Sequence, residues 1–119
     1  MASVLVVDDA AFMRMTIKQM LEPHGHVVVG EAENGIQAVE MFAELRPDIV
    51  ILDISMPEMN GIEALKRIKI LDPEAKNIIC TAIGQQVMLA DAIENGAEEF
   101  IVKPFEQAQL LAAIEKILN

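Results

Sequence analysis

The chain has 119 residues, of which 53% are hydrophobic and 24% charged, and its formal net charge is −10. This length predicts one domain, residues 1–119, with its own core, and no apolar stretch approaches the roughly 20 residues that cross a membrane. The negative net charge argues against nucleic-acid binding. Acidic residues follow the amino terminus too closely for a signal peptide, and the single cysteine, Cys80, excludes an internal disulfide. We expect a cytoplasmic monomer.

Five short apolar runs, rich in β-branched residues, predict strands at 3–8, 26–31, 48–53, 77–81 and 99–103. Runs such as VLVV and DIVIL are continuous, which is typical of parallel strands covered by helices on both faces. Between and after the strands, apolar residues recur at helical spacing and predict five helices. The helix faces are Met13, Ile17, Met20 and Leu21; Ala38, Val39, Phe42 and Ala43; Ile62, Leu65 and Ile68; Met88, Leu89, Ala92 and Ile93; and Leu110, Leu111, Ile114 and Ile117. This alternation predicts an α/β three-layer sandwich with a five-stranded parallel sheet.

Polar residues stand where four of these runs end: Asp8 and Asp9, Asp53, Thr81, and Lys103. In an open parallel sheet all of them emerge at one edge, where ligands bind. Three carboxylates and one ammonium would then share a pocket with an excess of negative charge. A divalent cation would balance this charge, and an all-oxygen set of ligands favours Mg²⁺ over zinc.

Two of these residues also have ordinary structural explanations. Aspartate is a favoured N-cap residue, which would explain Asp9 at the start of a helix. Aspartate is also common where turns begin, which would explain Asp53. Their joint placement with Thr81 and Lys103 favours a site. Asp53 stands alone in mid-chain before a loop, and a carboxylate can accept a phosphoryl group as an aspartyl phosphate. The cation, the Lys103 ammonium, the Thr81 hydroxyl and nearby backbone N–H groups would then neutralise the developing charge.

The same residues resemble a known family. The DD pair after VLVV, the segment DISMPEMNG, the TA after NIIC and FIVKPF are similar to receiver domains of two-component response regulators along the whole chain. Within that family, DDAAFMR, AIGQQ and FIVKPF resemble the single-domain receivers of bacterial chemotaxis. The resemblance implies a flavodoxin-like (βα)5 fold, with strand order 2-1-3-4-5 carried over from the family. It also implies a signalling switch that catalyses only its own phosphorylation and dephosphorylation.

The resemblance further assigns a role to each site residue. Asp53 is the phosphoacceptor for a CheA-like histidine kinase, and Thr81 and Lys103 hold the phosphoryl oxygens. The metal ligands are the side chains of Asp9 and Asp53 and the backbone carbonyl of Ser55, with Asp8 acting through water. The Lys103-Pro104 peptide bond is expected to be cis, which is uncommon for bonds before proline.

The signal would leave the site through two switch residues. In the family, Thr81 shifts toward the phosphate and the aromatic residue at Phe100 turns inward, although many chemotaxis receivers carry tyrosine there. The readout face is the fourth helix, fifth strand and fifth helix, and its partners are an output protein such as the flagellar switch and a phosphatase. Residues 77–115 contain six acidic residues and one basic residue, Lys103. This face therefore favours neutral or basic partners.

Two other functions share part of this pattern. An Asp-nucleophile phosphatase would use the same carboxylates, Mg²⁺ and lysine, but it typically has a second Asp as general acid where this chain has Ser55. An alternative is that the chain is the receiver half of a longer regulator, with unchanged phosphorylation chemistry. A basic stripe of Lys66, Arg67 and Lys69 is explained by a solvated helix face.

Overall fold

The computed structural model describes residues 1–119, apart from the side chain of Gln86. Five parallel strands form one sheet in the order β2-β1-β3-β4-β5, which confirms the predicted order. The strands are β1 (Ser3–Val7), β2 (Val27–Ala32), β3 (Ile49–Asp53), β4 (Lys76–Ala82) and β5 (Glu99–Lys103). Each predicted run agrees with its strand to within one residue at both ends, so the polar residues at the run ends stand at the strand ends.

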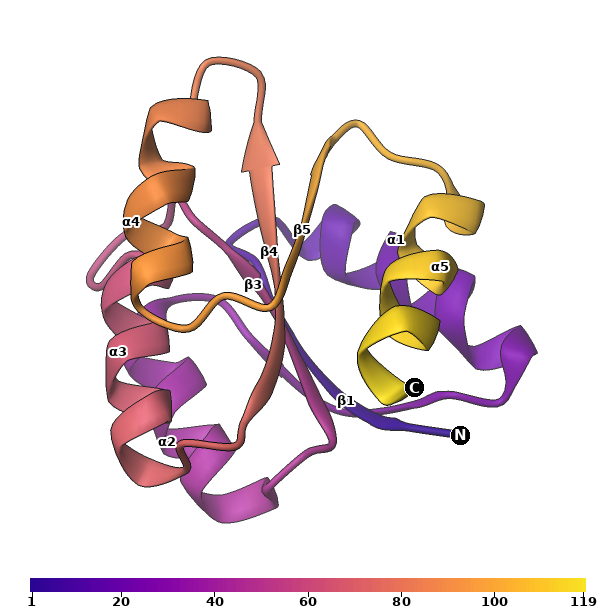
Figure 1. Ribbon diagram of the computed structural model, residues 1–119. Coiled ribbons are helices and arrows are strands. Elements are labelled where there is room, and N and C mark those ends of the chain that lie inside the picture. Colours follow the sequence, from indigo (N-terminus) through magenta and orange to yellow (C-terminus); the bar gives the residue numbers. More distant parts are fainter.

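The helices form a layer on each side of the sheet. They are α1 (Ala11–Leu21), α2 (Gly35–Leu45), α3 (Gly61–Leu71), α4 (Leu89–Glu94) and α5 (Gln107–Leu118), with short 3₁₀ turns η1 (Glu22–His24) and η2 (Gln86–Met88). Helices α1 and α5 cover one face, and α2, α3 and α4 cover the other (Figure 1). This is the flavodoxin-like three-layer sandwich that the sequence predicts. Within the part of the chain described, no helix is long and apolar enough to cross a bilayer.

Alternate residues of the central strands pack into two separate cores. Leu5 and Val7 of β1 contact the core under α2, α3 and α4, whereas Val4 and Val6 contact the core under α1 and α5. All four side chains are buried, because successive residues of a strand point to opposite faces. The apolar runs are therefore continuous because both faces of the sheet are covered.

The predicted helix faces differ from the structure at a few positions. Ala43 is exposed, Ile93 is 54% exposed, and Met88 belongs to η2 instead of α4. Helix α4 has only six residues, so it spans less than two turns. A helix this short contains too few residues for its buried face to be recognised from the spacing of apolar residues.

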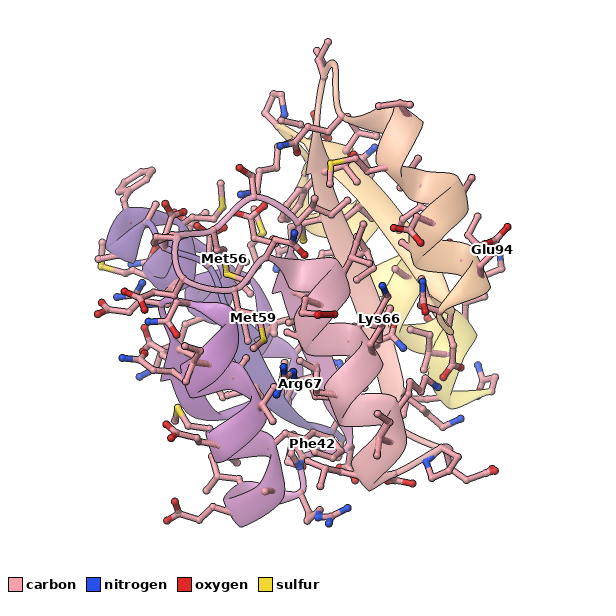
Figure 2. All side chains as sticks on the ribbon, turned by 90° about the vertical axis from the view of Figure 1, so that its left-hand side faces the viewer. Phe42, Met56, Met59, Lys66, Arg67 and Glu94 are labelled. Atoms are coloured by element: carbon pink, nitrogen blue, oxygen red, sulfur yellow. The ribbon has the colours of Figure 1, made fainter. Side chains whose placement is uncertain are left out.

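The loop between β3 and α3 is held against the start of two helices. The N–H of Gly61 donates to the carbonyl of Ile54 at 2.9 Å, and the N–H of Gly35 donates to the carbonyl of Met59 at 2.9 Å. A Cβ on Gly61 would overlap the carbonyl oxygen of Asp53, so only glycine permits this close approach. The loop carries the labelled Met56 and Met59 in Figure 2. It is therefore clamped at both ends, immediately beyond Asp53.

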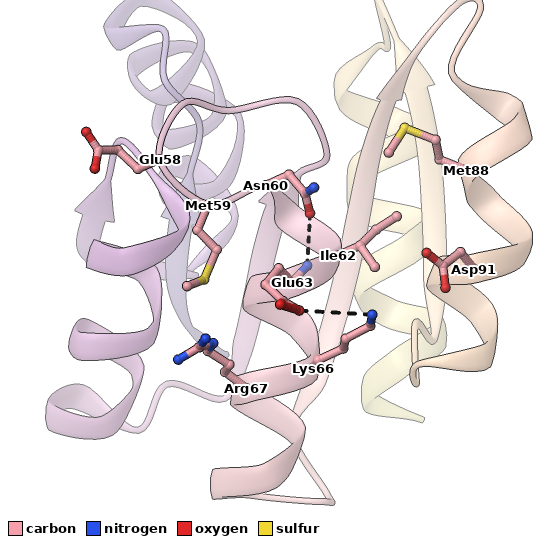
Figure 3. A pocket seen from close by; sticks show the side chains of 9 residues that line it. All are labelled: Glu58, Met59, Asn60, Ile62, Glu63, Lys66, Arg67, Met88 and Asp91. Carbon is pink, nitrogen blue, oxygen red and sulfur yellow. Dashed lines mark hydrogen bonds and ion pairs between the residues drawn. The ribbon is translucent and has the colours of Figure 1, made fainter.

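Helix α3 begins with a side-chain cap that follows this loop. Asn60 Oδ1 accepts a hydrogen bond from the N–H of Glu63 at 2.9 Å (Figure 3). Such a cap satisfies one of the backbone N–H groups that a helix leaves free at its start. The cap thus fixes where the loop after Asp53 ends.

Candidate functional site

Three carboxylates meet at the carboxyl edge of the sheet. Asp8 and Asp9 follow β1 and Asp53 ends β3, and one carboxylate oxygen from each lies within 4.8 Å of the other two. Asp8 is 2% exposed and Asp53 6%, whereas Asp9 is exposed to solvent. The set offers only oxygen ligands and opens to solvent at Asp9, so it fits a hard cation such as Mg²⁺.

Lys103 reaches this cluster from the end of β5. Its Nζ lies 2.7 Å from Asp8 Oδ2 and 3.3 Å from Asp53 Oδ2. The peptide bond between Lys103 and Pro104 is cis, as predicted. The other oxygen of Asp8, Oδ1, accepts a hydrogen bond from the N–H of Ala10 at 2.9 Å. Both oxygens of Asp8 are thus already hydrogen-bonded within the protein, which suits a residue that acts on a cation through water.

Burial and the neighbouring charges together shift two pKa values in the cluster. Burial raises the pKa of Asp53; the ammonium of Lys103 opposes this effect, and the negative charges of Asp8 and Asp9 add to it. Burial alone would lower the pKa of Lys103, but the hydrogen bond to Asp8 and the charges of Asp53 and Asp8 outweigh burial, so this pKa is raised. Lys103 is therefore held charged, and Asp53 lacks full compensation, which a bound cation would supply.

Thr81 lies near the end of β4, the strand next to β3, and follows the register partner of Asp53 by one residue. It is fully buried, and among the described side chains its Oγ1 is a buried polar atom with no hydrogen-bond partner. A buried hydroxyl without a partner carries a desolvation penalty that native proteins rarely leave uncompensated. This atom is therefore a candidate for a group that contacts a ligand.

Phe100 lies on the same face of the sheet as Thr81. Ile79 packs under α2, α3 and α4, and its register partner across β4 and β5 is Phe100. Thr81 follows Ile79 by two residues, so its side chain leaves the same face. Phe100 is 42% exposed. The structure thus puts both predicted switch residues on the α4 side of the sheet, with Phe100 outward.

Ser55 and Arg14 complete the surroundings of the site. Ser55 is exposed in the loop two residues after Asp53, as the sequence places it. Sequence reasoning missed Arg14, whose Nη1 donates to the carbonyl of Asp8 at 2.6 Å and whose Nε lies 3.1 Å from Glu31 Oε1. Its only signal in the sequence is its place on the first helix, six residues after Asp8. Arg14 positions the backbone that carries two of the three carboxylates.

A groove of about 490 Å³ lies away from this cluster, between α3 and α4 (Figure 3). On its rim Lys66 and Arg67 are exposed, as the sequence suggests, and Lys66 Nζ lies 4.0 Å from Glu63 Oε2. Lys69 differs from the expected solvated stripe, because its Nζ donates to the carbonyl of Ala75 at 2.7 Å. The rim carries both signs of charge and has no part in the acidic cluster.

Comparison with known proteins agrees with this fold and shows the family. The family model for the response regulator receiver domain matches residues 4–115, so the chain belongs to that family. It is 59% identical to the chemotaxis protein CheY of Bacillus subtilis (strain 168) over 116 residues, which are 98% of this chain and 97% of that protein. It is 55% identical to CheY of Thermotoga maritima over 114 residues, which are 96% of this chain and 95% of that protein. The chain is therefore a CheY-like receiver of two-component signalling, a chemotaxis response regulator.

Solved structures give the same result. A crystal structure of a CheX-CheY-BeF₃-Mg²⁺ complex from Borrelia burgdorferi matches with a TM-score of 0.94 and 34% identity. The match covers 98% of this chain and 89% of that chain. The response regulator domain of Thermotoga maritima CheB matches with a TM-score of 0.90 and 39% identity, over 98% of this chain and 96% of that chain.

Proposed function

We propose that Asp53 accepts a phosphoryl group from a histidine kinase, with Lys103 and Thr81 holding the transferred group. The observation that carries this proposal is the pairing of a buried carboxylate at the cluster with two groups that suit phosphoryl oxygens. The Lys103 ammonium lies 3.3 Å from Asp53 Oδ2, and the unpartnered Thr81 hydroxyl is buried on the neighbouring strand β4, one residue after the register partner of Asp53. A nucleophile, a cation and a hydroxyl donor at one edge are the parts that phosphoryl transfer needs.

The transfer is a displacement at phosphorus, in which Asp53 replaces the imidazole of the phosphohistidine. A carboxylate oxygen of Asp53 forms a bond to the phosphorus of a phosphohistidine as the bond from phosphorus to the imidazole nitrogen breaks. The electron pair of the broken bond stays on the imidazole. Lys103 neutralises charge on the phosphoryl oxygens, and the hydroxyl of Thr81 donates a hydrogen bond to one of them.

The acidic cluster would hold Mg²⁺ during this step. Asp9 and Asp53 would bind the ion through carboxylate oxygens and Ser55 through its backbone carbonyl, with Asp8 acting through water. When bound, the ion neutralises negative charge on the carboxylates and on the phosphoryl oxygens. The all-oxygen composition of the cluster and the raised pKa of Asp53 support this assignment.

The output surface would be the face formed by α4, β5 and α5. We propose that Thr81 and Phe100 link phosphorylation to this face, because both leave the same side of the sheet. The partners would be a CheA-like kinase, an output protein of the flagellar switch and a phosphatase. In this role the protein catalyses only its own phosphorylation and dephosphorylation. Affinity capture with and without beryllium fluoride would identify the output partner, which should be retained only with the fluoride.

Labelling with a phosphoryl donor tests the acceptor directly. With Mg²⁺ and a phosphorylated histidine kinase, the wild-type protein should acquire an acid-stable, hydroxylamine-labile label, and Asp53→Asn should acquire none. Asp48→Asn is the matched control, since Asp48 precedes the same strand at its opposite end and should label like the wild type. A label that persists in Asp53→Asn would refute the assignment of the acceptor.

A further inference from the structure

The turn after β4 places a glutamine side chain on a backbone N–H group at the edge of the site. The N–H of Gln85 donates to the carbonyl of Ala82 at 3.0 Å, which closes a turn over residues 82–85. Gly84 has a φ of +98° at the third position of this turn, as a type II turn requires. In return, the N–H of Ala82 donates to Gln85 Oε1 at 2.9 Å.

The N–H of Ala82 faces β3, the strand that ends at Asp53. The carbonyl of Cys80 accepts a hydrogen bond from the N–H of Ile54, so the polar backbone groups of Cys80 face β3. Backbone groups of alternate residues in a strand face the same neighbour, so the N–H of Ala82 also faces the β3 side, beyond Asp53. Its register partner in β5 is Lys103, whose Nζ lies 3.3 Å from Asp53 Oδ2.

We propose that Gln85 is a positioning residue that occupies the Ala82 N–H in the unphosphorylated protein and must release it when Asp53 is phosphorylated. An oxygen of the phosphoryl group would then replace Gln85 Oε1 as the acceptor of this hydrogen bond. The inference rests on the proposed role of Asp53. Release of Gln85 would remove one of the two hydrogen bonds that hold the turn over residues 82–85, directly before η2 and α4, and so would couple phosphorylation to the output side.

The energetic consequence has a definite sign. A contact present only in the unphosphorylated state favours that state by its own free energy, and removing the contact strengthens binding at Asp53 by the same factor. A neutral hydrogen bond between a side chain and the backbone corresponds to a factor of about two to ten. Removing Gln85 should therefore tighten binding of a phosphoryl mimic by about two- to tenfold.

The test uses beryllium fluoride with Mg²⁺, which mimics the acyl phosphate. Because the chain has no Trp or Tyr, binding is best followed by amide NMR of the whole protein. Gln85→Ala should bind beryllium fluoride about two- to tenfold more tightly than the wild type. Without fluoride, its Ala82 N–H should exchange with solvent faster than in the wild type. Gln85→Glu retains an acceptor oxygen and should bind no more tightly than the wild type.

Gln109 provides a matched control. Its Oε1 accepts a hydrogen bond from the N–H of Glu106 at 2.7 Å, the same contact over three residues, at the start of α5. Gln109→Ala should lower the melting temperature about as much as Gln85→Ala but leave the affinity for beryllium fluoride unchanged. Unchanged or weaker binding by Gln85→Ala would overturn the role of Gln85 alone. Equal binding by wild type and Asp53→Asn would overturn the proposed function and this role with it.

Discussion

Replacing Thr81 with valine would remove a buried polar atom for which the described part of the structure offers no partner. Valine keeps the β-branched shape that suits a strand, and its methyl group fills the place of the hydroxyl. A buried polar group left unpaired costs about 1–3 kcal/mol, so Thr81→Val should raise the free energy of unfolding by about 1–2 kcal/mol. For a chain of this size, that corresponds to a rise in melting temperature of roughly 3–8 °C.

The same change should weaken the response to phosphorylation, since a valine cannot donate to a phosphoryl oxygen. Urea unfolding followed by far-UV circular dichroism, with and without Mg²⁺ and beryllium fluoride, measures both effects. Thr16, the other threonine of the chain, is the matched control. Its Oγ1 donates to the carbonyl of Phe12 at 2.8 Å, so Thr16→Val loses a hydrogen bond and should not stabilise the protein. If Thr81→Val is no more stable than the wild type, the hydroxyl is satisfied and the reasoning fails.

Three further substitutions or reactions test the site and its support. Burial raises the pKa of Asp53 above its ordinary value of 3.8, so its ionisation lowers folding stability as the pH rises through the folded-state pKa. Asp53→Asn should therefore be more stable than the metal-free wild type in urea at pH 7, and this advantage should vanish below pH 3.8. Gly61→Ala should lower the free energy of unfolding by at least about 2 kcal/mol, because its Cβ would overlap the Asp53 carbonyl; an unchanged urea midpoint would contradict this. Burial raises the pKa of Cys80 to about 12, so iodoacetamide at pH 8 should label this thiol only in denaturant, and rapid labelling of the folded protein would show the thiol to be accessible.

The fold was predictable because its main determinants are local in sequence. Both faces of the sheet are covered, so each buried strand appears as a continuous apolar run such as VLVV. The parallel direction of the strands then brings Asp53, Thr81 and Lys103 to one edge without further information. The strand order itself came from the resemblance to the family, since periodicity carries no information on which strands are neighbours.

The contacts within the site were beyond sequence reasoning. Lys103 Nζ lies 2.7 Å from Asp8 but 3.3 Å from Asp53, a difference set by the twist of the sheet and by side-chain rotamers. The bond from Arg14 to the carbonyl of Asp8 depends likewise on the angle between α1 and the sheet. The turn at Gln85 depends on a positive φ at Gly84, which a glycine permits but does not require.

The clamped loop after Asp53 gives the molecule one stiff flank and one yielding flank around its acidic centre. On the stiff flank, Gly35 and Gly61 both donate hydrogen bonds to the loop, and the loop lies so close to them that neither position has room for a Cβ. On the yielding flank, a four-residue turn, a single 3₁₀ turn and a helix of six residues follow β4. If a group is attached to Asp53, we therefore expect the structure to yield toward the turn after β4 and α4, away from the loop that the two glycines hold.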